Sequence, residues 1–213
     1  MKISKLLMTA AVVVMFAGPA MAQTATPSDT PVSVKGQPRS AGEETQRDVN
    51  QQDRIENGLK DGQLTTGEAA RLENGEAHVD SVEAKDMKDG TLSAKDKAQI
   101  QAMQNKESHR IYDQKHDAQT GNPNSASDKR MQADVQRNIN QENRIENGVK
   151  SGQLTKREDA KLQGGEAHDD RRLARAGANG HIGKGEQRRI QAGDNRESRR
   201  VYWKKHNRVK KPT

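Results

Sequence analysis

Residues 54–65 read RIENGLKDGQLT, and the stretch returns 90 residues later, at 144–155, as RIENGVKSGQLT. With the same offset, residues 47–116 align with 137–206, and 33 of these 70 positions are identical. A repeat of this length indicates two copies of one structural unit.

Apolar residues in each copy follow the helical period of about 3.6 residues. Val49, Ile55 and Leu59 fall on one arc of a helix, and the second copy is apolar at the same three places. Glycine-containing turn signals at 61–62 and 89–90 divide the first copy into three segments, and short turns favour antiparallel helices. The sequence therefore predicts an all-α fold of two tandem three-helix (helix–turn–helix–turn–helix) repeat units joined by a flexible linker.

Capping signals mark where the second helix of each unit begins. Thr65 is followed three residues later by Glu68, and Thr155 by Glu158. Such pairs form a capping box, in which hydroxyl and carboxylate satisfy free backbone N–H groups. Glycines inside the following helix, at 74–75 and 164–165, are expected to weaken or bend it.

The two ends of the chain differ in composition from the repeats. Lys2 and Lys5 precede an apolar run at 6–16 and an A-x-A site, which is typical of a secretory signal peptide cleaved after Ala22. We expect a signal peptide at 1–22, a disordered spacer at 23–40, units at 41–117 and 128–207 around a linker at 118–127, and a basic tail at 208–213. The predicted location is periplasmic or secreted, and the mature chain has no transmembrane segment.

Composition limits the chemistry that the chain can support. Hydrophobic residues make up 30%, aromatic residues 2% and cysteine none of the sequence. So small an apolar content disfavours a deep, enclosed active site, and the lack of cysteine excludes disulfides and thiol chemistry. No nucleophile with its base, phosphate loop or zinc-protease helix is found, so we expect no enzyme and no resident cofactor.

The string RIENG…GQLT, together with NKESHRIY at 105–112 and the Lys115-His116 pair, resembles a group of exported proteobacterial proteins that carry repeated segments of this kind. The resemblance covers both units. It implies an exported helical protein and assigns no activity, so no functional residue follows from it.

The glycine turns distantly resemble the second half of an EF-hand calcium loop, with glycine at position 6 and a carboxylate at position 12. In the loop around Gly62, the candidate ligands are Asn57, Asp61 and Glu68, and in the loop around Gly90 they are Asp89 and Asp96. Position 3 never carries an oxygen ligand. Helix capping explains the same residues without a metal, and Ca²⁺ binding is the alternative.

Histidine offers a second metal hypothesis, because His109, Asp113 and His116 share one helical face. The second copy replaces the first two with arginine and tryptophan, and the tyrosine four residues before each terminal histidine suggests packing instead.

Glu107 and Glu197 interrupt an apolar stripe. We interpret each as an ion-pair partner of an arginine, either on the first helix of its unit or three residues further on.

Charge is shared unequally between the units. Residues 47–116 hold 11 Lys and Arg against 14 Asp and Glu, whereas residues 137–206 hold 17 against 10. Basic pairs supply a candidate interaction surface: Arg171, Arg172, Arg188, Arg189, Arg199, Arg200, Lys204 and Lys205.

A basic face attracts anions, but export and few aromatic residues disfavour nucleic acid. The sequence thus predicts a non-enzymatic exported protein that acts by binding. The expected role is envelope stress protection or interaction with a partner. The expected partners are anionic envelope components or another protein.

Overall fold

A computed structural model describes residues 41–207, and the predicted signal peptide, spacer and basic tail lie outside these residues. The described part forms six helices and no strand, which confirms the all-α prediction. The helices are α1 (Ala41–Lys60), α2 (Thr66–Asp86), α3 (Ala94–Lys115), α4 (Ala126–Lys150), α5 (Lys156–Gly177) and α6 (Lys184–Lys205). None of them is both long and apolar enough to span a bilayer.

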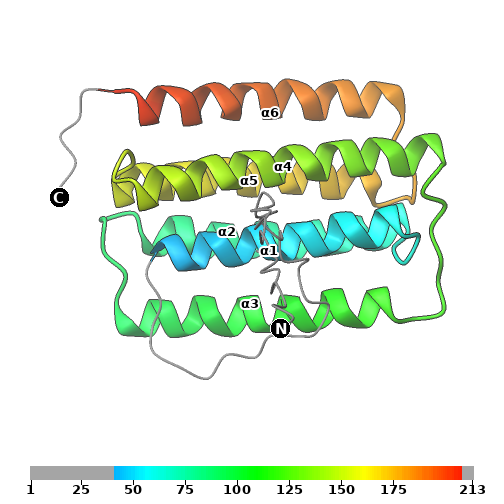
Figure 1. The fold of residues 1–213 in the computed structure, drawn as a ribbon, viewed down its shortest axis with the longest axis horizontal. Coiled ribbons are helices and arrows are strands. Elements are labelled where there is room, and N and C mark those ends of the chain that lie inside the picture. The colour runs from blue at the N-terminus through cyan, green and yellow to red at the C-terminus, as the bar shows by residue number, and fades with distance from the viewer. Residues whose placement is uncertain (1–40, 208–213) are drawn as a thin grey trace, which may run out of the picture.

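The helices stack in four layers (Figure 1). Two central layers hold α1 with α2 and α4 with α5, while α3 and α6 form the outer layers. The closest helix pairs are α2 with α5 and α1 with α4, so each central helix packs on its own repeat equivalent. The two units are thus related by an approximate two-fold, as in an isologous dimer.

Helices paired across the units run antiparallel. Lys150 Nζ near the end of α4 donates to Gln46 Oε1 near the start of α1 (3.2 Å), and Gln132 near the start of α4 donates to the carbonyl of Leu59 (3.3 Å). Small residues bring α2 and α5 close together at one end of their contact, where a Cβ on Gly177 would lie 2.9 Å from Ala70 Cβ. The acidic and basic units therefore pack directly against each other.

The repeated glycines close the first turn of each unit. Gly62 adopts a φ of 72°, and the carbonyl of Gly58 accepts the N–H groups of Gln63 (2.8 Å) and Leu64 (3.0 Å). A Cβ on Gly58 would lie 2.7 Å from Leu64 Cδ1, so glycine makes room for a fully buried leucine. Gly148 and Leu154 repeat this contact in the second unit.

The predicted capping boxes are confirmed. Glu68 Oε2 accepts from the Thr65 N–H (2.9 Å), and Glu158 Oε2 accepts from the Thr155 N–H (3.0 Å). Helix α2 continues without a break through 74–75, although glycine was expected to weaken it there. Helix α4 begins at Ala126, before the predicted boundary at 128, because Ser125 caps it by accepting from the Asp128 N–H (3.0 Å).

The segment between the units is bound to the first turn. The N–H of Gly121 donates to the carbonyl of Gly62 (2.9 Å), and Gln132 donates to the carbonyl of Pro123 (3.2 Å). A Cβ on Gly121 would overlap the carbonyl oxygen of Leu64. The prediction of a flexible linker is not confirmed, since these contacts hold the segment in one place.

Candidate functional site

Carboxyl groups occupy much of the space between the central helices. Aliphatic clusters draw on both units, but they share the interior with buried acids. On α1, α2, α4 and α5 these acids include Asp48, Glu73, Glu76, Asp80, Glu83, Glu142, Asp159, Glu166 and Asp170. Burial is the first cause of a raised pKa at every one of them. Burial in this interior therefore favours the protonated form of these carboxyl groups.

Asp80 and Asp170 occupy equivalent positions of the repeat, and their side chains hydrogen-bond to each other across the two-fold. Burial raises the pKa of Asp80 to about 7 and that of Asp170 well above its usual range. Asn138 Nδ2 donates to Asp170 Oδ1 (2.7 Å). Two carboxyl groups can hydrogen-bond only when one carries a proton, so this pair requires at least one.

Glu107 and Glu197 lie against glycines on the neighbouring helix. A Cβ on Gly75 would overlap the Glu107 carboxylate, and Gly165 stands in the same relation to Glu197. The glycines at 75 and 165 therefore leave room for the glutamate side chains of the outer helices α3 and α6.

The arginine partners of these glutamates lie on their own helices. Arg110 Nη1 contacts Glu107 Oε2 (2.8 Å), and Arg200 Nη1 contacts Glu197 Oε2 (3.0 Å). Of the two partners suggested by sequence, the arginine three residues further on is thus observed. Arg54 on the first helix donates instead to Ser108 Oγ (2.7 Å).

The predicted calcium ligands are placed mainly as caps. Glu68 and Asp96 close capping boxes, and Asp89 Oδ1 accepts from the Thr91 N–H (2.9 Å). Asn57 lies inside α1, and its carbonyl accepts the N–H of Asp61 (2.9 Å). Calcium would have to compete with these bonds, and its binding stays a prediction.

The histidine cluster lies on α3. His109 and Asp113 are exposed, while the His116 ring stacks on Tyr112 at 4.0 Å and its Nδ1 bonds the carbonyl of that residue (2.7 Å). Within residues 41–207, no group of three His, Asp or Glu side chains has the arrangement of a metal site.

Of the eight predicted interaction residues, six lie on α6 and two on α5. Arg188, Arg189 and Arg199 are exposed. Two others bind within the fold: Arg171 Nη2 donates to the carbonyl of Ala77 (3.3 Å), and Lys205 Nζ donates to that of Arg144 (3.1 Å). The basic surface is therefore centred on α6 and its border with α5.

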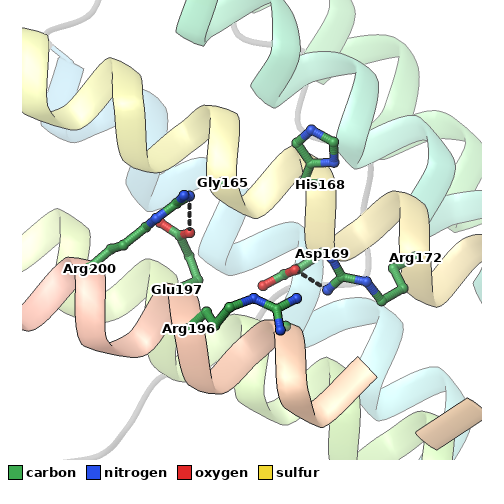
Figure 2. A pocket seen from close by; sticks show the side chains of 8 residues that line it. Gly165, His168, Asp169, Arg172, Arg196, Glu197 and Arg200 are labelled. Carbon is green, nitrogen blue, oxygen red and sulfur yellow. Dashed lines mark hydrogen bonds and ion pairs between the residues drawn. The ribbon is translucent and has the colours of Figure 1, made fainter. Parts of the chain in front are cut away.

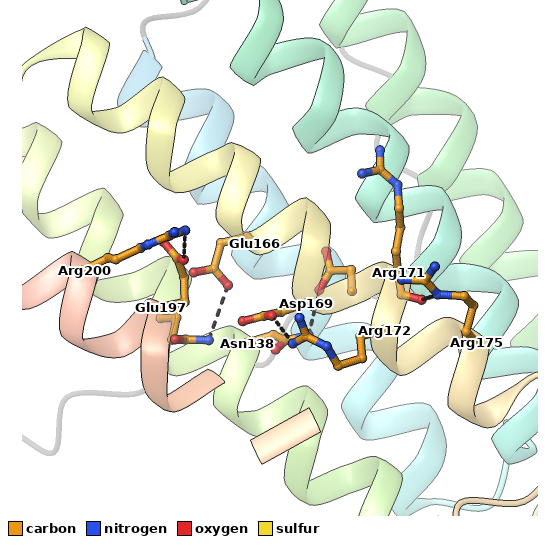
Figure 3. Close-up of polar contacts among 10 residues, drawn as sticks. Asn138, Glu166, Asp169, Arg171, Arg172, Arg175, Glu197 and Arg200 are labelled. Atoms are coloured by element: carbon orange, nitrogen blue, oxygen red, sulfur yellow. Dashed lines mark hydrogen bonds and ion pairs between the residues drawn. The ribbon is translucent and has the colours of Figure 1, made fainter. Parts of the chain in front are cut away.

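A hollow of about 240 Å³ opens at this border (Figure 2). Its lining residues are Gly165, His168, Asp169, Arg172, Gly193, Arg196, Glu197 and Arg200. Arg172 pairs with Asp169 on α5, and Arg200 pairs with Glu197 on α6, so two ion pairs face each other from the two helices (Figure 3). Each pair engages one nitrogen of a guanidinium that carries five N–H donors.

The exposed Arg196 adds a third guanidinium at the mouth of the hollow. Burial raises the pKa of Asp169, while the Arg172 guanidinium lowers it, and Arg196 acts in the same direction as Arg172. Three arginines and His168 thus surround two partly neutralised carboxyl groups. Such a site can bind the oxygen atoms of a small anion through several N–H donors.

The repeat shows how the second unit acquired this hollow. Arg172 and Gly193 stand where the first unit has Val82 and Met103. A Cβ on Gly193 would overlap the Arg172 guanidinium, so the glycine is what admits the arginine. The two units therefore differ here: the first has two apolar residues, and the second has an arginine that packs against a glycine.

Sequence reasoning found Arg172 and Arg200 but missed Arg196, His168 and Gly193. The signal that could have revealed them is a difference between the two copies: Val82 aligns with Arg172, and Met103 aligns with Gly193. No protein-family model, curated protein or solved structure matches the chain.

Proposed function

We propose that the protein is a non-enzymatic, exported binding protein that holds anionic partners on the basic border of α5 and α6. The hollow lined by Arg172, Arg196 and Arg200 carries this proposal. It is smaller than the roughly 300–1,000 Å³ of a pocket for a drug-sized molecule, and it suits a single anionic group such as a phosphate on a larger partner.

The surrounding charge supports the same function. Most of the excess of Lys and Arg lies in the second unit, and the exposed arginines of α6 continue from the mouth of the hollow along the helix. A surface of one sign raises the local concentration of anions, and added salt screens it. Binding is therefore expected to weaken as salt is added.

A set of three substitutions tests the hollow without changing the net charge. Asp169→Val, Arg172→Val and Gly193→Met together import the residues of the first unit at the equivalent positions. Because they remove Asp169 together with its partner Arg172, neither member of this ion pair is left without the other.

Isothermal titration with inorganic polyphosphate at several salt concentrations provides the measurement. The parent is expected to bind, and the triple variant is expected to lose most of the affinity although its net charge is the same. Lys95→Ala, on the exposed start of α3, serves as the control and should bind as the parent does. Equal affinity of the parent and the triple variant would contradict the proposal.

A further inference from the structure

An aromatic pair is exposed in the last turn of α6. Helix α6 forms the outer layer of the second unit (Figure 1). Tyr202 is 50% exposed and Trp203 is 68% exposed, and their rings meet edge to face at 5.5 Å. Neither ring is needed to fill the apolar core next to it, where Val201 is the buried residue of this turn. Two large rings in water indicate a contact surface.

Cations share the helical face of Trp203. Arg199 lies four residues and Arg196 seven residues before it, so all three project from one side of α6, and all three are exposed. Arg188 and Arg189 continue the basic surface toward the start of the helix.

The acids of α6 are turned away from this face. Asp194 and Glu197 are buried toward the rest of the fold, and Glu186 binds the N–H of Gly183 at the start of the helix (2.8 Å). The outer face of α6 therefore carries arginines along its length and aromatic rings at its end.

The first unit lacks this arrangement. Arg199 and Trp203 are replaced there by His109 and Asp113. The face is thus a feature of the second unit and not a consequence of the repeated helix packing.

We propose that the outer face of α6 docks on an anionic lipid surface, with Trp203 and Tyr202 in the headgroup layer and the arginines on lipid phosphates. Tryptophan and tyrosine favour the membrane–water interface, because one end of each ring system is apolar and the other is polar. Basic residues strengthen such contacts with anionic lipids. The docking rests on the proposed function and names its partner.

The charge on the face favours a lipid surface among anionic partners. A row of arginines along one helix can contact several phosphates in the plane of the headgroups. The rings at the end of the row can reach the apolar boundary beneath those phosphates. The contact is peripheral, because no helix within residues 41–207 can cross a bilayer.

Trp203 makes the test direct, since it is the single tryptophan of the chain. The form expected after cleavage at Ala22, residues 23–213, is mixed with phosphatidylcholine vesicles that contain or lack phosphatidylglycerol, and tryptophan emission is recorded together with co-sedimentation. Removing residues 1–22 keeps the apolar run at 6–16 from inserting into the vesicles by itself. Inorganic polyphosphate is titrated in parallel.

Binding to the phosphatidylglycerol vesicles with a blue shift of Trp203 emission is expected, and salt should reverse both. Each basic residue near an anionic surface contributes roughly a fivefold factor in binding. Arg196→Gln with Arg199→Gln should therefore reduce vesicle binding about 25-fold. Lys95→Gln with Lys106→Gln, two exposed lysines of α3, is the matched control and should reduce it far less.

The outcomes separate this inference from the proposed function. Binding to polyphosphate without binding to vesicles overturns the lipid contact and leaves anion binding intact. Vesicle binding with unchanged Trp203 emission overturns the aromatic contact. If neither probe binds, both proposals fail.

Discussion

Replacing Asp80 with asparagine should stabilise the protein in neutral and alkaline solution. The buried Asp80 hydrogen-bonds to its repeat equivalent Asp170, and burial raises its pKa from 3.8 to about 7. Asparagine has nearly the same shape, and its carbonyl oxygen can accept from a protonated Asp170 while its amide can donate to an ionised one. The substitution therefore keeps the contact and removes the need to protonate this position.

The sign of the effect follows from proton linkage. The folded protein holds the Asp80 proton at pH values where the unfolded chain has already released it. The contribution of Asp80 to the free energy of unfolding is therefore fully present below the unfolded pKa of 3.8 and is lost as the pH rises through about 7. A difference of about three pKa units corresponds to about 4 kcal/mol.

Urea unfolding at about pH 5 and about pH 8, followed by circular dichroism, measures this contribution. Asp80→Asn should raise the free energy of unfolding by up to about 4 kcal/mol at the higher pH and by a much smaller amount at the lower pH. Asp113→Asn, at an exposed position, should change neither value. A variant with the same pH dependence as the parent would refute the role assigned to the buried pair.

Three further substitutions test the packing. Gly75→Ala should lower the free energy of unfolding by about 1–3 kcal/mol, because the new Cβ overlaps the Glu107 carboxylate; a more stable variant would contradict the contact. Thr65→Ala should cost about 1 kcal/mol through loss of the cap. Thermal unfolding in EDTA and in calcium should give the same loss if the turn acts as a cap, and a loss seen only in calcium would favour the metal interpretation. Gly121→Ala should lower the thermal midpoint, because its Cβ overlaps the Leu64 carbonyl; an unchanged midpoint would mean that the segment between the units is not bound as described.

The helices and turns were predictable because their signals are local. Thr65 with Glu68 forms a capping box wherever a helix follows, and Gly62 supplies the positive φ that the turn needs. These interactions join residues a few positions apart, so the sequence alone contains both partners.

The pairing of the units was not predictable in this way. Asp80 and Asp170 meet because α2 packs on α5, and no local pattern marks a carboxyl group as an interior residue. Acids on a helix are usually solvated. The sequence-based estimate of the interior therefore counted only apolar residues and left out the buried carboxyl groups. Gly75 was expected only to weaken or bend its helix for the same reason, since its partner Glu107 lies on another helix.

The hollow was predicted in part. Arg172 and Arg200 were selected as members of basic pairs, whereas Arg196 stands alone in the sequence and joins them only when α5 and α6 lie side by side. Arg171 belongs to the same basic pair as Arg172, but it binds α2 through the carbonyl of Ala77. Charge in the sequence located the basic unit, and helix packing determined which arginines are available to a ligand.

The most direct test of anion binding by the second unit is an NMR titration of the arginine Nε–H signals with inorganic polyphosphate. The signals of Arg172, Arg196 and Arg200 are predicted to shift together and to saturate at one ligand concentration. Arg110, which pairs with Glu107 in the first unit as Arg200 pairs with Glu197 in the second, is predicted to stay in place. Equal shifts at Arg110 and Arg200, or no shift at any of the four, would contradict a binding site between α5 and α6.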